Sequence, residues 1–181
     1  MENAIKEIEI KDLNFQYTDN LGRKNKVIEN FNLNIELGKV VCLFGPNGCG
    51  KSTLLKLLAS IIKENEQSIT IFGKKASDID IGYIPQDFAE SLFPWLSNLD
   101  NIAFPLYVKG TPKYEARFRS KKIAFELSDS IPLDNYPYES SLGQKQLVSL
   151  ARALNNSSKV LLADEPFSAL DFKTSVKLIL I

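Results

Sequence analysis

The sequence contains no histidine and only two cysteines, Cys42 and Cys49, among its 181 residues. The lack of histidine excludes nucleophilic catalysis of the Ser-His-Asp and Cys-His types. The two cysteines are too far apart for a CxxC pair, so the common zinc-binding patterns are excluded as well. We expect both thiols to be reduced, as in a cytosolic protein. Any catalysis by this chain must therefore depend on carboxylates, lysine, amides and backbone N–H groups.

The chain also lacks net charge and long apolar runs. It carries 22 Lys+Arg against 22 Asp+Glu, and this balance excludes a strong electrostatic attraction to nucleic acid or anionic lipid. No apolar run approaches the roughly 20 residues that a membrane-spanning helix needs, and the N-terminus alternates in charge, unlike a signal peptide. The length and the 44% hydrophobic content fit one globular domain. We expect no nucleic-acid partner, and a membrane role only through another protein.

Hydrophobic patterning predicts paired strands followed by a parallel α/β unit. Apolar residues alternate with polar ones over 8–17 and 31–35, with a polar turn at 18–25 between them. The continuous apolar run at 40–44 predicts a strand buried on both faces, and a helical pattern follows at 51–62. The order strand, glycine-rich loop, helix is typical of the opening of a parallel sheet.

The rest of the chain is predicted to be mainly helical, with short strands between. Further strands are expected at 69–72 and 81–84, and a second buried strand at 159–163. Helices are expected over 98–131 with a break at 110–112, from about Ser141 onward, and from residue 172.

The glycine-rich loop matches the phosphate-binding pattern G-x-x-x-x-G-K-[ST] and lies between a predicted strand and a predicted helix. Its glycines let backbone N–H groups surround a phosphate, and the helix N-terminus adds its positive end. Lys51 supplies a cation for the β- and γ-phosphates of a nucleoside triphosphate, and the Ser52 hydroxyl can bind Mg²⁺. The candidate nucleotide-binding residues in this loop are Gly45, Pro46, Asn47, Gly48, Cys49, Gly50, Lys51, Ser52 and Thr53.

Two carboxylates, Asp164 and Glu165, follow the predicted strand at 159–163. The ends of parallel strands are where open α/β sheets bind ligands. Asp164 is expected to hold Mg²⁺, directly or through water, and Glu165 to act as general base toward the attacking water. Acidic residues are also common in ordinary turns, so this interpretation depends on the phosphate-binding loop upstream.

With these motifs, the chain resembles the ATP-binding subunits of ABC transporters along nearly all of its length. Residues 45–53 match the Walker A motif and 160–165 the Walker B motif; 168–171 resemble the D-loop. Gln86 resembles the Q-loop glutamine, which implies roles in catalysis and Mg²⁺ binding and in signalling to a permease. Tyr17 matches the A-loop aromatic residue that stacks on adenine; a strand tyrosine in a small core is the alternative.

The resemblance implies an α/β fold of the P-loop NTPase type, specifically an ABC ATPase. We expect one domain over 1–181 with an N-terminal antiparallel β-subdomain and a helical subdomain at about 87–155. The family's switch histidine follows the D-loop by a few tens of residues, whereas this chain ends ten residues after Asp171. The fold is therefore expected to be truncated at the C-terminus, and a fragment is favoured over a family member that has dispensed with the switch.

Residues 140–146 resemble the family signature LSGGQ and differ from it in part. Ser141, Gly143 and Gln144 fit the pattern, and the resemblance implies that they contact the γ-phosphate held by a second subunit. Leu142 replaces a glycine, so its side chain is expected to obstruct that approach or to change the backbone angles. Ser140 replaces leucine, and Leu147 stands where arginine is common.

Within the family, residues 86–106 resemble the import ATPases of the nitrate, sulfonate and taurine group. The apolar residues Phe93, Trp95 and Leu96 fit this group, or simply a contact with any permease. The resemblance implies an ATPase at the cytoplasmic face of the cell membrane, attached through transmembrane permease subunits. Its other expected partners are a second ATP-binding subunit, arranged head to tail, and indirectly a solute-binding protein.

Two other functions are weighed against this one. A degenerate subunit that binds ATP without hydrolysing it is suggested by Leu142 and by the missing histidine. A small-molecule kinase is disfavoured because a kinase does not require the Q-loop, signature and D-loop motifs in this order.

Overall fold

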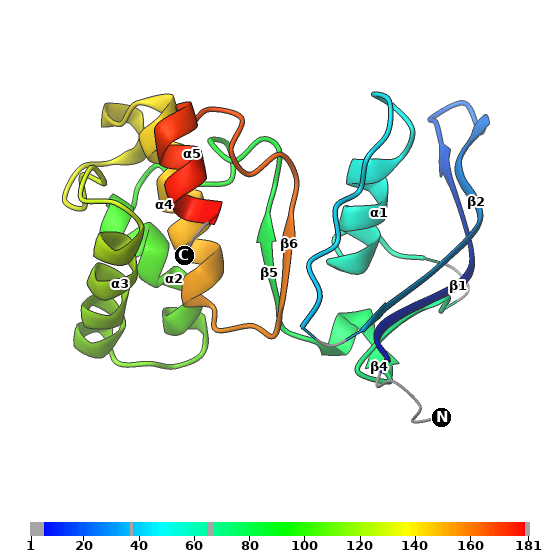
Figure 1. Ribbon diagram of the computed structural model, residues 1–181, viewed down its shortest axis with the longest axis horizontal. Helices are drawn as coiled ribbons and strands as arrows, with labels where there is room; N and C mark the ends of the chain where they lie inside the picture. The colour runs from blue at the N-terminus through cyan, green and yellow to red at the C-terminus, as the bar shows by residue number, and fades with distance from the viewer. Residues whose placement is uncertain (1–5, 37, 65–66, 180–181) are drawn as a thin grey trace. The chain divides into compact units, whose positions relative to one another are not determined.

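The structure is a computed structural model that describes residues 6–36, 38–64 and 67–179. The chain divides into two compact units, Met1–Asp80 and Ile81–Ile181, and most of their helices and strands are labelled in Figure 1. The expected single domain over 1–181 with a helical subdomain at about 87–155 stays a prediction. The α/β fold class is confirmed, since both units combine strands with helices.

The first unit is built on an antiparallel sheet with the strand order β2-β1-β3-β4. Its strands are β1 (Lys6–Thr18), β2 (Lys24–Glu36), β3 (Ile69–Ile71) and β4 (Lys74–Lys75). Ile8, Ile10 and Leu13 of β1 are buried, and Ile69 and Ile71 of β3 cover the same core. The strand pair is confirmed: Ile8 and Ile10 are two residues apart and so share one face of the sheet, and an irregularity in register between Ile10 and Leu13 accounts for the buried Leu13 three residues later.

The turn between β1 and β2 is held by Asp19. Its Oδ1 accepts hydrogen bonds from the N–H groups of Leu21 and Arg23, both at 2.8 Å. Gly22 has a φ of 76°, which glycine adopts without steric cost. The polar turn predicted at 18–25 is confirmed.

The predicted buried strand at 40–44 is wrong in this structure, because these residues form no strand. A strand needs a neighbouring strand for its backbone hydrogen bonds. The described part of the first unit contains only the antiparallel sheet, and none of its strands pairs with 40–44. The helix that follows, α1 (Lys51–Leu58), begins where predicted and ends four residues earlier than the predicted boundary at 62.

The second unit places helices beside two parallel strands, β5 (Ile81–Ile84) and β6 (Val160–Ala163). Its main helices are α2 (Asn98–Val108), α3 (Lys113–Leu127), α4 (Leu142–Asn155) and α5 (Phe172–Ile179). Short 3₁₀ helices are η2 (Pro137–Glu139) here and η1 (Ala76–Asp78) in the first unit. The break between α2 and α3 confirms the prediction at 110–112, where Gly110 has a φ of 80°.

A hydrophobic core joins α4 to the other elements of the second unit. Buried residues of α4, among them Leu147, Val148 and Ala151, pack with Ile84 of β5 and Ile102 of α2. Burial of such side chains contributes roughly 1.5–3 kcal/mol each. Leu147 is therefore a core residue, which explains leucine at a position where the family commonly has arginine.

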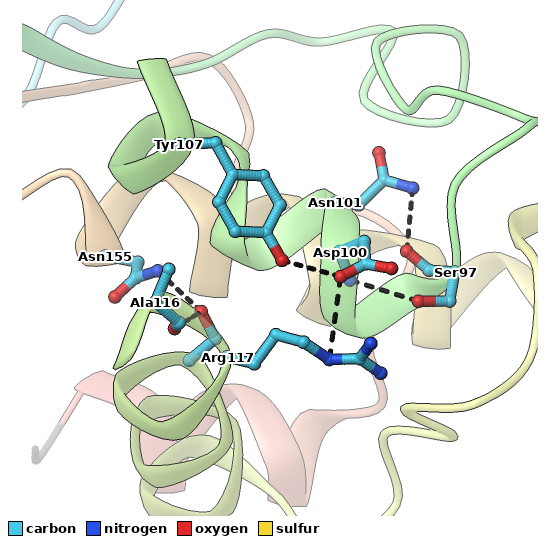
Figure 2. A network of polar contacts seen from close by, with 8 residues as sticks. Ser97, Asp100, Asn101, Tyr107, Ala116, Arg117 and Asn155 are labelled. Carbon is cyan, nitrogen blue, oxygen red and sulfur yellow. Dashed lines mark hydrogen bonds and ion pairs between the residues drawn. The ribbon is translucent and has the colours of Figure 1, made fainter. Parts of the chain in front are cut away.

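Buried asparagines add a polar framework to this core. Asn101 is fully buried, and its Nδ2 donates to the carbonyl oxygens of Phe93, Leu96 and Ser97 at 3.0–3.1 Å. Its Oδ1 accepts the N–H of Phe93 at 2.8 Å. Figure 2 shows this side chain on α2, directed at Ser97, which caps the helix. One amide thus fixes the path of the whole loop at 93–97.

Other polar contacts in Figure 2 join α2 and α4 to α3. Asp100 accepts a hydrogen bond from the Tyr107 hydroxyl at 2.7 Å and lies 3.7 Å from Nε of Arg117. Burial, together with this hydrogen bond, raises the pKa of the Tyr107 hydroxyl well above its usual value. Asn155 of α4 donates to Ser120 Oγ of α3 at 2.9 Å. The three helices are therefore locked by hydrogen bonds as well as by packing.

We predict that Asn101→Ala lowers the free energy of unfolding by about 2–4 kcal/mol, because it leaves buried backbone groups of 93–97 without partners. Urea denaturation measures this change. Val108→Ala, at an exposed position of the same helix, is the matched control and should change stability by less than about 0.5 kcal/mol. Equal stability of the two variants would contradict the role given to Asn101.

Candidate functional site

The predicted site residues fall into two groups, one in each unit. Tyr17 and the loop at 45–53 belong to the first unit, whereas Gln86, the signature residues and the Walker B carboxylates belong to the second.

The phosphate-binding loop depends on two glycines with left-handed backbone. Gly48 has a φ of 79° and Gly50, which precedes α1, a φ of 97°. A Cβ atom at Gly50 would lie 3.1 Å from Cγ1 and 3.3 Å from the carbonyl oxygen of Val27. Both the backbone angle and the close approach of β2 therefore require glycine here. Because Gly50 has no side chain to cap α1, the N–H groups of the first turn face the loop.

Lys51 lies against its own loop. Its Nζ donates to the carbonyl oxygens of Gly45 and Pro46, both at 2.9 Å, and Cys49 Sγ is 4.0 Å away. The ammonium group is thus held against the first residues of the loop, and Lys51 is itself the first residue of α1. A cation and a helix N-terminus at one place form an anion-binding arrangement.

Tyr17 lies beside this loop, and its stacking on adenine stays a prediction. Its hydroxyl is 3.4 Å from Oγ1 of Thr53 on α1. The ring packs edge-on against Phe15 at 5.0 Å between centroids, and the residue is 41% exposed. Such exposure does not fit the alternative of a tyrosine packed in a small core. An open aromatic face next to a phosphate-binding loop can stack on a base.

In the second unit, Gln86 and Asp164 follow neighbouring parallel strands. Ile84 of β5 pairs with Ala163 of β6, and the N–H of Asp164 donates to the carbonyl oxygen of Ile84 at 2.9 Å. Gln86 is exposed two residues beyond β5. The structure therefore brings the loops that carry these two residues to the same edge of the sheet.

Asp164 is buried, and its Oδ2 atom has no hydrogen-bond partner. The Tyr83 hydroxyl is likewise buried without a partner. Burial, followed by the charges of Asp164 and Asp87, raises the pKa of Tyr83. A buried carboxylate oxygen without a donor is costly unless a cation is close. The donor atoms here therefore fit Mg²⁺, a cation that is commonly bound through one or two carboxylates together with phosphate oxygens.

Glu165 is exposed and has a left-handed backbone with a φ of 51°. Its carbonyl oxygen accepts hydrogen bonds from the Ser168 N–H and from Gln146 Nε2, both at 3.2 Å. Few non-glycine residues adopt this conformation, and it costs of the order of 1 kcal/mol. The Glu165 side chain is therefore accessible to solvent, whereas the backbone of the same residue is fixed by hydrogen bonds within the second unit.

The D-loop segment ends by capping the last helix. Asp171 Oδ1 accepts the N–H of Thr174 at 3.0 Å, and Oδ2 accepts its hydroxyl at 2.7 Å. These hydrogen bonds hold the pKa of Asp171 below its usual value. Asp171 has a local role as the N-terminal cap of α5.

The signature residues form the start of α4. Ser141 and Gln144 make a capping box: the Gln144 N–H donates to Ser141 Oγ at 3.3 Å, and Gln144 Oε1 accepts the Ser141 N–H at 2.9 Å. Ser141 therefore supports the helix of its own chain, and contact with the phosphate of a second subunit stays a prediction. Ser140 is buried and accepts a hydrogen bond from Asn98 at 2.8 Å, which explains serine in place of leucine.

Leu142 is the first residue of α4 and is 58% exposed. It is absent from the described residues with positive φ, so the change of backbone angle expected for leucine at this position is not needed. The other expected effect, obstruction by the bulky leucine side chain, stays a prediction. This side chain is exposed at the N-terminus of the helix.

Gln146 is a residue to which the sequence analysis gave no role. It is fully buried and joins α4 to the turn that carries Glu165 and Ser168. The sequence offered one signal for this role: a glutamine on the apolar side of a predicted helix. Gln146 lies three residues after Gly143, and positions i and i+3 share one helix face.

The described residues include no group of three or more Cys, Asp or Glu side chains that could hold a metal ion. None of their helices has both the length and the apolar character to span a bilayer. Cys42 and Cys49 are exposed free thiols.

The profile of the family described as "ABC transporter" matches residues 28–168. The chain is 40% identical over 182 residues to the spermidine/putrescine import ATP-binding protein PotA of Borrelia garinii subsp. bavariensis, covering 96% of the chain and 49% of that protein. It is 44% identical over 156 residues to the aliphatic sulfonates import ATP-binding protein SsuB of Bacillus subtilis, covering 83% of the chain and 58% of that protein. The chain thus spans about half the length of these curated relatives.

Solved structures agree with this match. The dimeric structure of MJ0796, a bacterial ABC transporter cassette, superposes with a TM-score of 0.86 at 32% identity, covering 96% of this chain and 80% of that one. A post-hydrolysis state of the same cassette, bound to ADP and Pi, also has a TM-score of 0.86, at 31% identity. The P-loop NTPase fold of the ABC cassette type is therefore confirmed.

Proposed function

The chain belongs to the ABC transporter family, and from this premise we propose that it is the ATP-binding and ATP-hydrolysing subunit of an importer. The observation that carries the proposal is the phosphate-binding loop of the first unit. There Lys51 Nζ, the N-terminus of α1 and the open ring of Tyr17 lie together.

ATP binding follows from the chemistry of this loop. The backbone N–H groups at 45–53 and the first turn of α1 donate to the phosphate oxygens. Lys51 exchanges its carbonyl contacts for the β- and γ-phosphates, which gains a charge-assisted interaction. Tyr17 stacks on the adenine ring. The nucleotide is thereby held by its phosphates and its base.

Hydrolysis is assigned to Glu165, which follows β6. The resemblance gives Ser52 of α1, Gln86 after β5 and Asp164 after β6 as the residues that would hold Mg²⁺, and this ion would neutralise phosphate charge. Glu165 accepts a proton from the water whose oxygen attacks the γ-phosphorus, and the bond to the β–γ bridging oxygen breaks, giving ADP and inorganic phosphate.

The proposed partners are a second ATP-binding subunit and transmembrane permease subunits, with a solute-binding protein acting indirectly. Dimerisation is supported by the dimeric MJ0796 cassette. The family resemblance adds that the dimer is head to tail, with Ser141, Gly143 and Gln144 of one chain facing the ATP of the other. Trp95 is 71% exposed and is an aromatic anchor for the permease. We propose on this basis that the subunit lies at the cytoplasmic face of the membrane and that it has no nucleic-acid partner.

The transported solute is a finer proposal. The nitrate, sulfonate and taurine group is supported by the 44% identity to the sulfonate protein SsuB. The relatives also include proteins named for spermidine/putrescine, sulfate/thiosulfate and ergothioneine. We therefore propose import of a small solute and take a sulfonate-like anion as the first one to test.

A subunit that binds ATP without hydrolysing it is the alternative, and the exposed Leu142 favours it. A bulky side chain at the first turn of α4 lies where the partner's γ-phosphate is proposed to bind.

We predict that Lys51→Met raises the dissociation constant for Mg·ATP at least ~10-fold, because a charge-assisted hydrogen bond contributes about 1.5–3 kcal/mol. Isothermal titration calorimetry measures this change. Lys56→Met, on the exposed side of the same helix, is the matched control and should bind within about twofold of the unmodified chain. If both variants bind like the unmodified chain, the loop does not bind ATP and the proposed function is wrong.

We predict that Leu142→Gly and Leu142→Ala both raise ATP turnover or nucleotide-dependent dimerisation, by about tenfold, because each removes the same obstruction. A tenfold gain corresponds to about 1.4 kcal/mol. A phosphate-release assay and light scattering measure the two quantities. A gain in the glycine variant alone would assign the effect to backbone freedom, contrary to the helical φ at this position. No change in either quantity would exclude obstruction by Leu142.

A further inference from the structure

Gln146 connects the signature helix to the turn at 165–169 of the same chain. Its Nε2 donates to the Glu165 carbonyl oxygen at 3.2 Å and lies 3.4 Å from Ser168 Oγ. Its Oε1 accepts the Ala169 N–H at 2.8 Å. The residue is fully buried, so these hydrogen bonds are made without competition from solvent. One amide thus satisfies backbone groups at both ends of the turn.

Gly143 allows the turn to approach this closely. A Cβ atom at Gly143 would lie 3.1 Å from the Ala169 carbonyl oxygen, which is tighter than ordinary contact. Gly143 and Gln146 are three residues apart and so share one face of α4. The turn therefore lies on a surface made by a glycine and a buried amide, and both contact Ala169.

The turn needs such support because of Glu165. Its φ of 51° is unfavourable for a residue with a side chain. The Glu165 carbonyl oxygen accepts the hydrogen bond from Gln146, so a loss of that bond removes one of the contacts that stabilise this conformation. The direction of the Glu165 carboxylate depends on this backbone conformation, since the side chain leaves the chain at the same residue.

We propose that Gln146 is a positioning residue: its side chain holds the turn at 165–169 and thereby sets the direction of the Glu165 carboxylate. The structural part of this inference stands on the contacts of the second unit alone. Its catalytic consequence rests on the proposed function, in which Glu165 is the general base. Because α4 also begins with Ser141, Gly143 and Gln144, one rigid helix then carries the residues proposed to face the partner's ATP and the support for this chain's own base.

The test is Gln146→Met, which has a side chain of similar length and no hydrogen-bonding amide. Amide hydrogen exchange at Ala169 should become at least tenfold faster, because its N–H loses its acceptor. ATP turnover should show kcat lowered at least tenfold, with KM for ATP within about twofold, since small misplacements of reacting groups cost up to about 10²-fold in rate. Gln146 is not among the residues proposed to hold the nucleotide, so binding is expected to persist.

Two controls on α4 separate positioning from general destabilisation. Val148→Ala makes a cavity in the core beside Gln146 and removes none of the hydrogen bonds to the turn. Ser149→Ala removes a buried hydroxyl that has no partner. Both should keep the parental exchange rate at Ala169 and the parental kcat. If Val148→Ala changes both quantities as much as Gln146→Met, the effect is general destabilisation and the proposal is overturned.

The remaining outcomes are also decisive. Unchanged exchange at Ala169 in Gln146→Met overturns the proposal at the structural level, and faster exchange with unchanged kcat overturns its catalytic part. If the unmodified chain does not hydrolyse ATP, the proposed function fails separately, and the exchange rate alone then decides whether Gln146 holds the turn.

Discussion

The anchoring of helix α4 by buried polar side chains is the constraint on which the second unit depends. Gln146 holds the turn with Glu165, and Asn155 donates to Ser120 Oγ of α3. Arg152, whose pKa burial lowers to about 10, donates to the carbonyl and hydroxyl oxygens of Ser91 at 2.7 Å. Leaving any of these groups unpaired in the interior would cost more than the bond itself contributes. Helix α4 is therefore firmly joined to the segments that its side chains bind.

In the first unit the corresponding constraint is steric. Gly50 is required both by its left-handed backbone and by the approach of Val27. This brings the N-terminus of α1, the Lys51 ammonium group and Tyr17 to one place with little side-chain bulk between them. The unit thereby offers positive charge and backbone donors to an anion and an open ring to a base. Affinity for a nucleotide follows from backbone geometry as much as from the lysine.

Much of this could be predicted from the sequence because the signals are local. Alternation over 8–17 predicted β1, the glycine and proline at 110–112 predicted the break after α2, and Ser141 predicted the start of α4. The strand at 40–44 was wrong because a strand depends on a partner that apolar patterning does not identify. Gln146 was missed for a similar reason. Its importance lies in hydrogen bonds to residues 19–23 positions away, which no local pattern contains.

We propose above all that this chain binds ATP and that Glu165 is the general base in its hydrolysis. The most direct test measures Mg·ATP affinity and single-turnover phosphate release for the unmodified chain and for Glu165→Gln, which keeps the shape of the side chain and removes the base. The account predicts equal affinity within about twofold and a rate lowered at least ~100-fold in the variant, the range expected for loss of a general base. Phosphate release at the parental rate in Glu165→Gln would contradict it.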